Sequence, residues 1–304
     1  MEMHTVVLIV GAGPAGLATA ACLTQLSIPY IIVEREDGSA SLWRNRAYDH
    51  LKLHLAKEFC ELPHMPYPAD APTYIPKAQF VKYLDNYIEH FDTQPKYQTA
   101  VESSSYDEAR MCWISLACDM TTSVVVRYMA RFLIVASGEN SAENILAIPG
   151  LHGFAGETIH SSRYKSGATY SCNNVLVVGS GNSGMEIAYD LASHGANTSI
   201  VIRSPVHVLG NISKIKGNIV EFEGMKKRAF DAIVFATGYK STANTWLKNG
   251  ESMLNNDGLP KKEFPNHWKG ANGLYCAGLA KRGLAGIAMD AKSIANDILS
   301  NYRA

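Results

Sequence analysis

The chain has 304 residues, of which 47% are hydrophobic and 18% are charged, a balance typical of folded globular enzymes. Basic and acidic residues number 28 each, so no overall field favours nucleic acid or an anionic membrane as a partner. No apolar run reaches the roughly 18 residues of a membrane-spanning helix, and no cationic segment precedes the first apolar run. We therefore expect a cytoplasmic protein without a signal peptide or a membrane span.

The first element is an apolar strand, Val6–Val10, that runs directly into the glycine turn GAGPAG and a helix predicted over residues 14–26. This order is typical of a dinucleotide-binding fold, in which the helix N-terminus holds a pyrophosphate. A second strand, Tyr30–Val33, ends in Glu34, 23 residues after Gly11. A carboxylate at that distance bonds ribose hydroxyls and repels a 2′-phosphate, although a solvated strand end is the alternative.

The stretch 41–68 is rich in aromatic residues, histidine and proline, and it shows no clean periodicity. It predicts a loop-rich wall around a ligand rather than a flexible linker. Its functional candidates are Trp43, Arg44, His54 and Lys57, although a structural role is the commoner one for any single histidine.

Three further elements lead to the middle of the chain. Residues 76–91 place apolar side chains at helical spacing and predict an amphipathic helix. Residues 97–135 alternate as strands, and the apolar segment 131–136 is expected to rejoin the first sheet. Ile148-Pro149-Gly150 then predicts a linker into a second unit.

The strand and glycine turn are repeated in VLVVGSGNSG, which begins at Val175. One such match is weak evidence, but two in the same strand–turn–helix context indicate two dinucleotide sites. The strand 198–202 ends in Arg203, at the position equivalent to Glu34, where a guanidinium can clamp a 2′-phosphate. The first site therefore suits FAD and the second NADPH. Asn182 either bridges the two nucleotides or is only a turn residue.

The segment between Arg203 and the strand 232–236 is short. It has 28 residues, whereas a further βαβ unit takes about 30 or more. There is room for a hairpin of strands 212–215 and 219–222, so we expect an abbreviated second domain. A short strand at 273–278 and a helix over 283–300 complete the chain.

These elements predict an α/β fold of two Rossmann-like, three-layer domains, the second inserted in the first. Residues 1–150 and 232–304 are assigned to the FAD domain, and residues 151–231 to the shortened NADPH domain. The residues expected to contact nucleotide are Gly11, Gly13, Gly16, Glu34 and Trp43 in the first domain, Gly179, Gly181, Gly184 and Arg203 in the second, and Thr237, Gly238 and Gly278 at later strand ends.

Several motifs together resemble the class B flavin-dependent monooxygenases: GAGPAG, the box Phe154-x-Gly156-x-x-x-His160-x-x-x-Tyr164, GSGNSG and FATGY. Within that class, SLWRNRAYDHLKLHLAKEFCELPHMPYP, GNSGMEIAYDL and FPNHWKGANGLYCAG are similar to the plant YUCCA flavin monooxygenases. The likeness covers nearly the whole chain. This sequence departs from the family after Arg203–Leu209, where several tens of residues that normally complete the NADPH domain are missing.

This resemblance implies FAD, NADPH and O₂ as reactants in the conversion of a 2-oxo acid, indole-3-pyruvate, to the auxin indole-3-acetic acid. It implies that Arg44, His54 and Lys57 line the flavin and substrate end, with His54 at a position where many flavin monooxygenases carry an asparagine near the flavin. Because the hard chemistry belongs to the cofactor, no nucleophilic triad or carboxylate pair is expected.

Two alternatives stay open. One is another NADPH-dependent flavoprotein reductase, but the six cysteines include no CxxC pair and no metal-ligand spacing, so we expect no metal site and no disulfide-reductase centre. The other is a truncated, catalytically impaired paralogue that binds FAD only, which the short segment 204–231 favours. The sequence does not indicate the oligomeric state.

Overall fold

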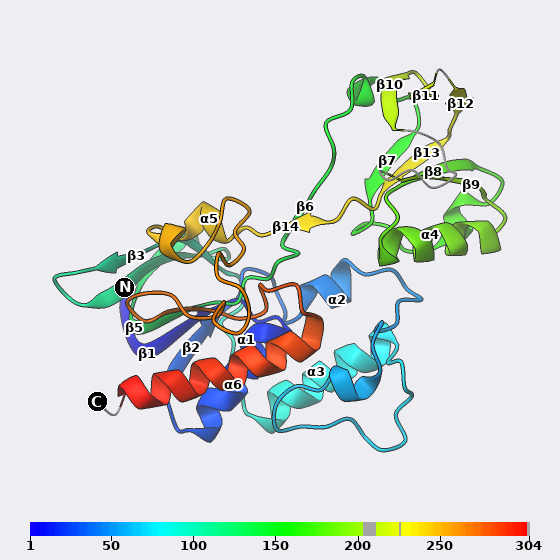
Figure 1. Cartoon of the computed structure of the whole chain (residues 1–304). Coiled ribbons are helices and arrows are strands. Elements are labelled where there is room, and N and C mark those ends of the chain that lie inside the picture. The colour runs from blue at the N-terminus through cyan, green and yellow to red at the C-terminus, as the bar shows by residue number, and fades with distance from the viewer. Residues whose placement is uncertain (203–210, 225, 303–304) are drawn as a thin grey trace. The chain divides into compact units, whose positions relative to one another are not determined.

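The computed structural model describes residues 1–202, 211–224 and 226–302. Contacts between its residues divide the chain into two compact units. The first contains Met1–Arg44, Lys52–Ala142 and Lys240–Ala304, and the second contains Asn45–Leu51 and Glu143–Tyr239. Figure 1 follows the chain through both units.

One mixed sheet forms the centre of the first unit, with strand order β2-β1-β5-β4-β3 and with β15 beside the carboxyl end of β5. The predicted return of the segment near Ala136 to the first sheet is confirmed, because Val10 of β1 pairs with Val135 of β5. β1, β2, β5 and β15 pair in parallel, and β3 and β4 extend the sheet in antiparallel fashion. The strands are β1 (Glu2–Val10), β2 (Tyr30–Val33), β3 (Thr99–Asp107), β4 (Cys112–Asp119), β5 (Val124–Val135) and β15 (Leu274–Cys276).

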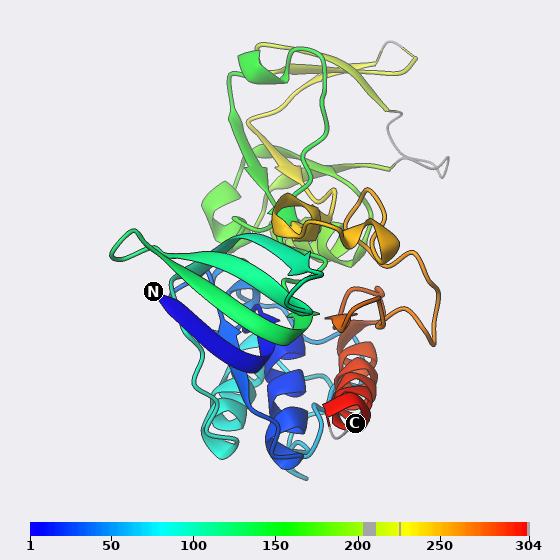
Figure 2. The ribbon, with the colours of Figure 1, turned by 90° about the vertical axis from the view of Figure 1, so that its left-hand side faces the viewer.

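Helices cover one face of this sheet, where α1 (Pro14–Gln25), α3 (Lys77–His90) and α6 (Gly283–Tyr302) bury a shared apolar cluster. Figure 2 shows them together on that side. The other face carries the short α5 (Ala243–Trp246), packed in a cluster with Trp113. The predicted helices at 14–26, 76–91 and 283–300 are therefore confirmed, and so is the three-layer α/β arrangement.

The stretch 41–68 contains only α2 (Ser41–Asn45) and the single turn η1 (Lys57–Phe59), so the predicted loop-rich character is confirmed. Further 3₁₀ turns in the chain are η2 (Leu151–Gly153), η3 (Gly167–Tyr170) and η4 (Gly250–Ser252).

The second unit contains a parallel sheet with strand order β7-β13-β8-β9. Buried aliphatic residues fill β8 and β13, as expected for strands covered on both faces. α4 follows the second glycine turn and packs on one face, while a three-stranded antiparallel sheet, β10-β11-β12, packs on the other. The elements are β7 (Glu157–His160), β8 (Asn174–Val178), α4 (Asn182–Ser193), β9 (Asn197–Val201), β10 (Ile212–Lys216), β11 (Ile219–Phe222), β12 (Lys227–Ala229) and β13 (Ala232–Phe235).

The assignment of residues 232–239 to the first domain is wrong. β13 pairs with β7 on one side and with β8 on the other, so it is a central strand of the second unit's sheet. The error has a local cause, since FLIVASG and AIVFATG are equivalent strand ends, one in each sheet. The predicted hairpin of 212–215 and 219–222 is confirmed as β10 and β11.

Two very short strands, β6 (Ala142–Glu143) and β14 (Tyr239–Lys240), pair with each other where the chain leaves and re-enters the first unit. Within the described residues, the helices are too short or too polar to cross a membrane.

Candidate functional site

The first glycine turn brings the N-terminus of α1 directly onto the end of β1. Gly11 has φ +110°, and a Cβ there would overlap the carbonyl oxygen of Ala136 at the end of β5. A Cβ on Gly16 would overlap the carbonyl oxygen of Gly11, so only glycine fits at both positions. Gly13, by contrast, has open space beside it, and no side chain caps α1. This cradle exposes helix N-terminal amides on an open side, which fits a nucleotide pyrophosphate.

Glu34 turns back onto this glycine turn. Its carboxylate accepts hydrogen bonds from the amides of Ala12 at 2.7 Å and Glu36 at 2.9 Å. Burial raises the pKa of Glu34, and the two amide bonds oppose that rise. The structure therefore places a carboxylate beside the pyrophosphate cradle, as the spacing from Gly11 predicts. Its contact with a ribose stays a prediction.

Two more strand ends meet at the same cradle. A Cβ on Gly278, at the end of β15, would lie 3.0 Å from the Cβ of Ala15 in the first turn of α1. At the end of β5, the hydroxyl of Ser137 is buried and has no hydrogen-bond partner among the described residues. The sequence reasoning did not select Ser137, although its place in the Ala136-Ser137-Gly138 turn was the available signal. An unpaired buried hydroxyl here fits a site that is completed by a polar ligand.

The second glycine turn repeats this geometry in the second unit. Gly179 has φ +115°, and a Cβ there would overlap the carbonyl oxygen of Ala236 at the end of β13. A Cβ on Gly184 would overlap the carbonyl oxygen of Gly179, whereas Gly181 again has open space beside it. The residues present therefore fit a second nucleotide. Asn182 is the exposed first residue of α4.

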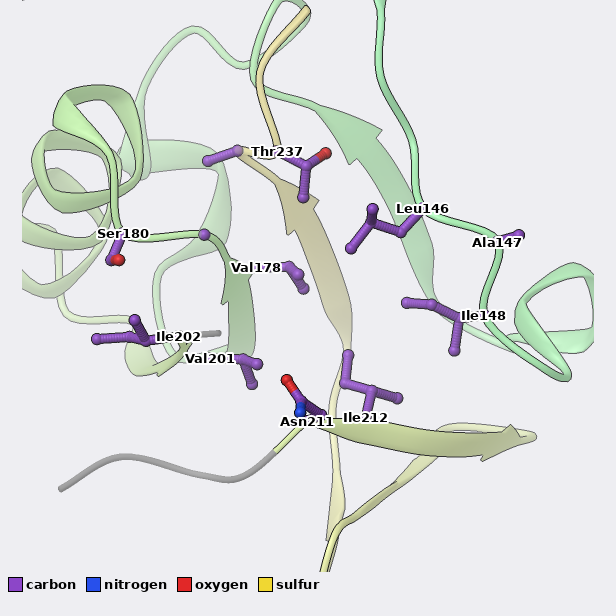
Figure 3. Close-up of a pocket in the computed structure, with 12 residues that line it drawn as sticks. Leu146, Ala147, Ile148, Val178, Ser180, Val201, Ile202, Asn211, Ile212 and Thr237 are labelled. Atoms are coloured by element: carbon purple, nitrogen blue, oxygen red, sulfur yellow. The ribbon is translucent and has the colours of Figure 1, made fainter. Parts of the chain in front are cut away.

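A cavity of about 520 Å³ opens at this turn, at the carboxyl ends of β8, β9 and β13 (Figure 3). In parallel α/β sheets this edge is where ligands bind. Thr237 lines the cavity, and its hydroxyl donates to the carbonyl oxygen of Asn144. The other lining residues are Leu146, Ala147, Ile148, Val178, Gly179, Ser180, Val201, Ile202, Asn211, Ile212 and Ala236. Arg203, the predicted phosphate clamp, lies outside the described residues.

The box ahead of the second glycine turn holds Gly238 in place. His160 is buried at the end of β7 and donates from Nε2 to the carbonyl oxygen of Gly238 at 2.9 Å. Its Nδ1 accepts from the Ser162 amide at 3.2 Å, and the Ser162 hydroxyl donates to Glu143 at 2.6 Å. Burial lowers the pKa of His160. The sequence reasoning found the box but missed that β7 pairs beside β13.

The box also fastens α4. Tyr164 donates its hydroxyl to Asp190 Oδ2 at 2.5 Å, and the Gly167 amide donates to the same oxygen at 2.6 Å. Asp190 lies in α4 and is buried. His160 and Tyr164 therefore hold two different elements beside the second glycine turn. His160 holds the chain at Gly238, after β13, and Tyr164 holds α4.

A strap from the loop-rich wall, residues 45–51, also packs on α4. Tyr48 is 3% exposed and donates its hydroxyl to Glu186 at 2.5 Å. Asp49 donates its amide to the carbonyl oxygen of Lys165 at 3.1 Å, and the Lys165 ammonium donates to the carbonyl oxygen of Asn45 at 2.7 Å. The sequence offered no signal for this, because the strap lies between elements of the first unit.

The contacts of Arg44, Trp43 and Lys57 from the wall lie in the first unit. Arg44 pairs with Asp85 of α3 and donates from Nε to the carbonyl oxygen of Ser39 at 2.7 Å. Trp43 packs edge-on against Phe80 of α3, with ring centroids 4.6 Å apart. Lys57 donates to three backbone carbonyl oxygens between residues 68 and 71. His54 is exposed. The contact of these residues with flavin or substrate stays a prediction.

Among the residues that the structure describes, no group of three or more histidine, cysteine, aspartate or glutamate side chains is arranged to hold a metal ion. The six thiols are free, and three of them, those of Cys22, Cys60 and Cys276, are buried.

Comparisons with known proteins agree with the site. A family described as pyridine nucleotide-disulphide oxidoreductase matches residues 8–214. The probable indole-3-pyruvate monooxygenase YUCCA10 of Arabidopsis thaliana is 43% identical, and the alignment covers 98% of each chain. Indole-3-pyruvate monooxygenase YUCCA6 of the same plant is 38% identical, with 95% of this chain and 89% of that protein covered. The YUCCA10 alignment spans 375 positions, so at least 71 of them hold no residue of this 304-residue chain.

Solved structures share the fold. The flavin-containing monooxygenase from Stenotrophomonas maltophilia has a TM-score of 0.85 at 19% identity, over 99% of this chain and all of that one. The bacillithiol disulfide reductase Bdr from Bacillus cereus matches equally well, with a TM-score of 0.85 at 18% identity over 98% and 100%. Since both classes share the architecture, the fold by itself does not choose between oxygenase and reductase.

Proposed function

Because this chain belongs to the YUCCA family of flavin-containing monooxygenases, we propose that it uses FAD and NADPH to decarboxylate indole-3-pyruvate oxidatively to indole-3-acetic acid. The observation that carries the proposal is the pair of equivalent glycine cradles, one in each unit. The overall reaction balances as one 2-oxo acid, O₂, NADPH and a proton giving one shorter carboxylic acid, CO₂, NADP⁺ and water.

FAD is assigned to the first unit. The open side of Gly13, the uncapped N-terminus of α1 and the carboxylate of Glu34 suit a pyrophosphate followed by a ribose without a 2′-phosphate. Gly278, after β15, and Ser137, after β5, lie at the two neighbouring strand ends. A bound flavin supplies hydride acceptance and O₂ activation, while these residues bind and orient it.

NADPH is assigned to the second unit, with its pyrophosphate at Gly179–Gly184 and its adenosine end toward the cavity at β8, β9 and β13. His160 holds the Gly238 turn, and Tyr48, Tyr164 and Asp190 hold α4. Asn182 and Arg203 keep their proposed roles, as a bridge between the nucleotides and as a clamp on the 2′-phosphate.

The wall residues Arg44, His54 and Lys57 are proposed for the flavin and substrate end. The contacts of Arg44 with Asp85 and of Lys57 with backbone carbonyls support a shaping role, since both cations hold the loop in place. His54 is the exposed member of the three.

An anaerobic reduction experiment tests the proposal. Purified protein with bound FAD is mixed with NADPH without oxygen, and loss of the yellow absorbance is followed. We expect NADPH to bleach the flavin, and air with indole-3-pyruvate to yield indole-3-acetic acid and CO₂. Protein that binds FAD but is not bleached by NADPH would contradict the monooxygenase proposal.

A second candidate function is FAD binding without NADPH-driven turnover. It is favoured by the alignment with YUCCA10, in which at least 71 positions lack a residue here, and by the position of β9 at the edge of the described sheet. Substitution of Arg203 by alanine separates the two. In the active enzyme it raises the requirement for NADPH far more than that for NADH, whereas in the inactive form neither nucleotide reduces the flavin.

A further inference from the structure

A buried histidine–aspartate pair lies in the first unit beside the turn that follows β15. His267 and Asp290 have side chains 3% and 2% exposed, and Nε2 of the histidine lies 2.8 Å from Oδ1 of the aspartate. We propose that this pair is a positioning device for the flavin nucleotide, because it holds the turn after β15 against the first glycine cradle. The inference rests on the proposed binding of FAD in this unit.

The link to the cradle runs through Gly278. The second carboxylate oxygen of Asp290 accepts the Gly278 amide at 2.9 Å. Gly278 has φ +70°, and a Cβ there would lie 3.0 Å from that of Ala15, in the first turn of α1. Asp290 therefore holds the backbone of a residue that sits directly against the helix that is expected to receive the pyrophosphate.

His267 is held as firmly as its partner. The Cys276 thiol donates to the carbonyl oxygen of His267 at 3.4 Å, and the Cys276 amide donates to the carbonyl oxygen of Trp268 at 3.0 Å. The ring of Phe264 stacks on the His267 ring, with centroids 5.9 Å apart. Cys276 of β15 thus fixes the backbone of the loop at His267 and Trp268, and Asp290 accepts from one donor in this loop and from one in the following turn.

Stabilisation of the core does not by itself account for a polar pair at this place. Burial raises the pKa of Asp290, while Gly278, His267 and Arg282 oppose that rise. Nδ1 of His267 is buried and has no hydrogen-bond partner among the described residues. Apolar side chains of similar size commonly stabilise a core as well as a buried ion pair does. They would not, however, offer an acceptor to the Gly278 amide.

The chain offers a matched control on the same helix. Asp297, two turns further along α6, accepts from Lys269 Nζ at 2.6 Å and from the Tyr275 hydroxyl at 2.7 Å. It joins α6 to β15 and its loop, as Asp290 does, but among the described residues its side chain does not bond the Gly278 turn. Its loss should weaken the packing of α6 without moving the cradle.

The experiment compares Asp290→Ala, Asp290→Asn and Asp297→Ala with the wild-type chain after removal of flavin. FAD is titrated by quenching of its fluorescence, the absorption spectrum of the bound flavin is recorded, and amide exchange at Gly278 is measured without flavin. We expect Asp290→Ala to raise the Kd for FAD at least tenfold, to alter the spectrum and to speed exchange at Gly278 at least tenfold. Asp290→Asn keeps an acceptor and should stay within threefold, and Asp297→Ala within twofold.

Equal FAD affinity in the wild-type chain and in Asp290→Ala would overturn the inference. So would an equal loss in Asp297→Ala, since that would assign the effect to the packing of α6. If Asp290→Ala does not fold, His267→Leu replaces it, with an expected loss of at least threefold in affinity and with no change counting against the inference. A wild-type chain that does not bind FAD would overturn the proposed function itself, and the inference with it.

Discussion

The two glycine turns of this protein have nearly the same backbone but different surroundings. In both, the first glycine has φ above 100° and lies against the carbonyl oxygen of an alanine at a neighbouring strand end. In both, the amide of that alanine donates at 2.9 Å to the carbonyl oxygen of the last residue of the strand that enters the glycine turn. These pairs are Ala136 with Val10 and Ala236 with Val178. The local geometry of a cradle therefore does not depend on the size of the domain around it.

The surroundings differ in how much of the structure supports each helix. Residues 15–23 of α1 are all buried, between the sheet and the neighbouring helices. α4 leaves Met185 and Tyr189 51% and 76% exposed, and within the described residues β9 ends its sheet. The second helix buries only part of its length, with Ile187, Ala188 and Leu191 in the apolar cluster, and adds hydrogen bonds to Tyr48 and Tyr164. The first cradle is supported mainly by apolar burial, and the second by a smaller apolar cluster together with a few specific hydrogen bonds.

The largest expected effect comes from adding a methyl group to either helix glycine. Gly16→Ala and Gly184→Ala each force a Cβ onto a backbone carbonyl oxygen, which costs about 1–3 kcal/mol or more where the backbone must shift. We expect the first to abolish FAD binding and the second to abolish flavin reduction by NADPH while FAD stays bound. Gly38→Ala, where a Cβ meets nothing within 4 Å, is the control. Loss of FAD from Gly184→Ala would show that the two cradles are not independent.

A smaller effect is expected from Tyr48→Phe, which removes one of the polar ties of α4. The carboxylate of Glu186 loses a buried donor, at a cost of about 1–3 kcal/mol. We expect the Kd for NADPH to rise about tenfold, with FAD affinity unchanged. Tyr74→Phe, at an exposed position, is the control. Measurement of both affinities decides whether the strap supports only the second cradle.

The smallest effect is the dependence of the free energy of unfolding on pH. A buried group in the second unit and one in the first contribute to it with opposite signs. The pKa of His160 is lowered from 6.5 by burial, so below that pH the unfolded chain binds more protons than the folded one. Its contribution to stability is complete above pH 6.5 and is lost as the pH falls toward the folded pKa. Glu34 in the first unit has a raised pKa, so the folded chain holds that proton more tightly and its contribution declines as the pH rises from 4.5.

The measurement is urea unfolding of the wild-type chain and of His160→Gln between pH 5 and pH 7.5. Stability of the variant should depend less steeply on pH between 5 and 6.5, by at most about 1.4 kcal/mol per pH unit, which is the limit for one proton. Glu34→Gln should act in the opposite direction, because it removes the decline in stability that the wild-type carboxyl causes as the pH rises above 4.5. Parallel profiles for His160→Gln and the wild-type chain would contradict the role given to burial of the imidazole.

The two cradles also show which features follow from short stretches of sequence and which depend on contacts between residues far apart in the chain. Both cradles, the hairpin of β10 and β11, and helices α3 and α6 were predictable, because each rests on a pattern within about 20 residues of sequence. The position of β13 was not, because ASG and ATG strand ends are locally alike and only pairing shows which sheet each one joins. Nor was the packing of Tyr48 on α4, since 138 residues separate it from Glu186.

By itself the sequence determined where the nucleotide cradles lie, since the positive φ of Gly11 and Gly179 and the clash of a Cβ on Gly16 or Gly184 with those glycines are requirements within the motif. It determined the family as well, through motifs spread over nearly the whole chain. Only the tertiary structure decided which strand ends complete each cradle and which buried polar groups hold them. Gly278 at the first and Gly238 at the second are held by Asp290 and His160, whose hydrogen bonds depend on packing between segments that have no local relation in sequence.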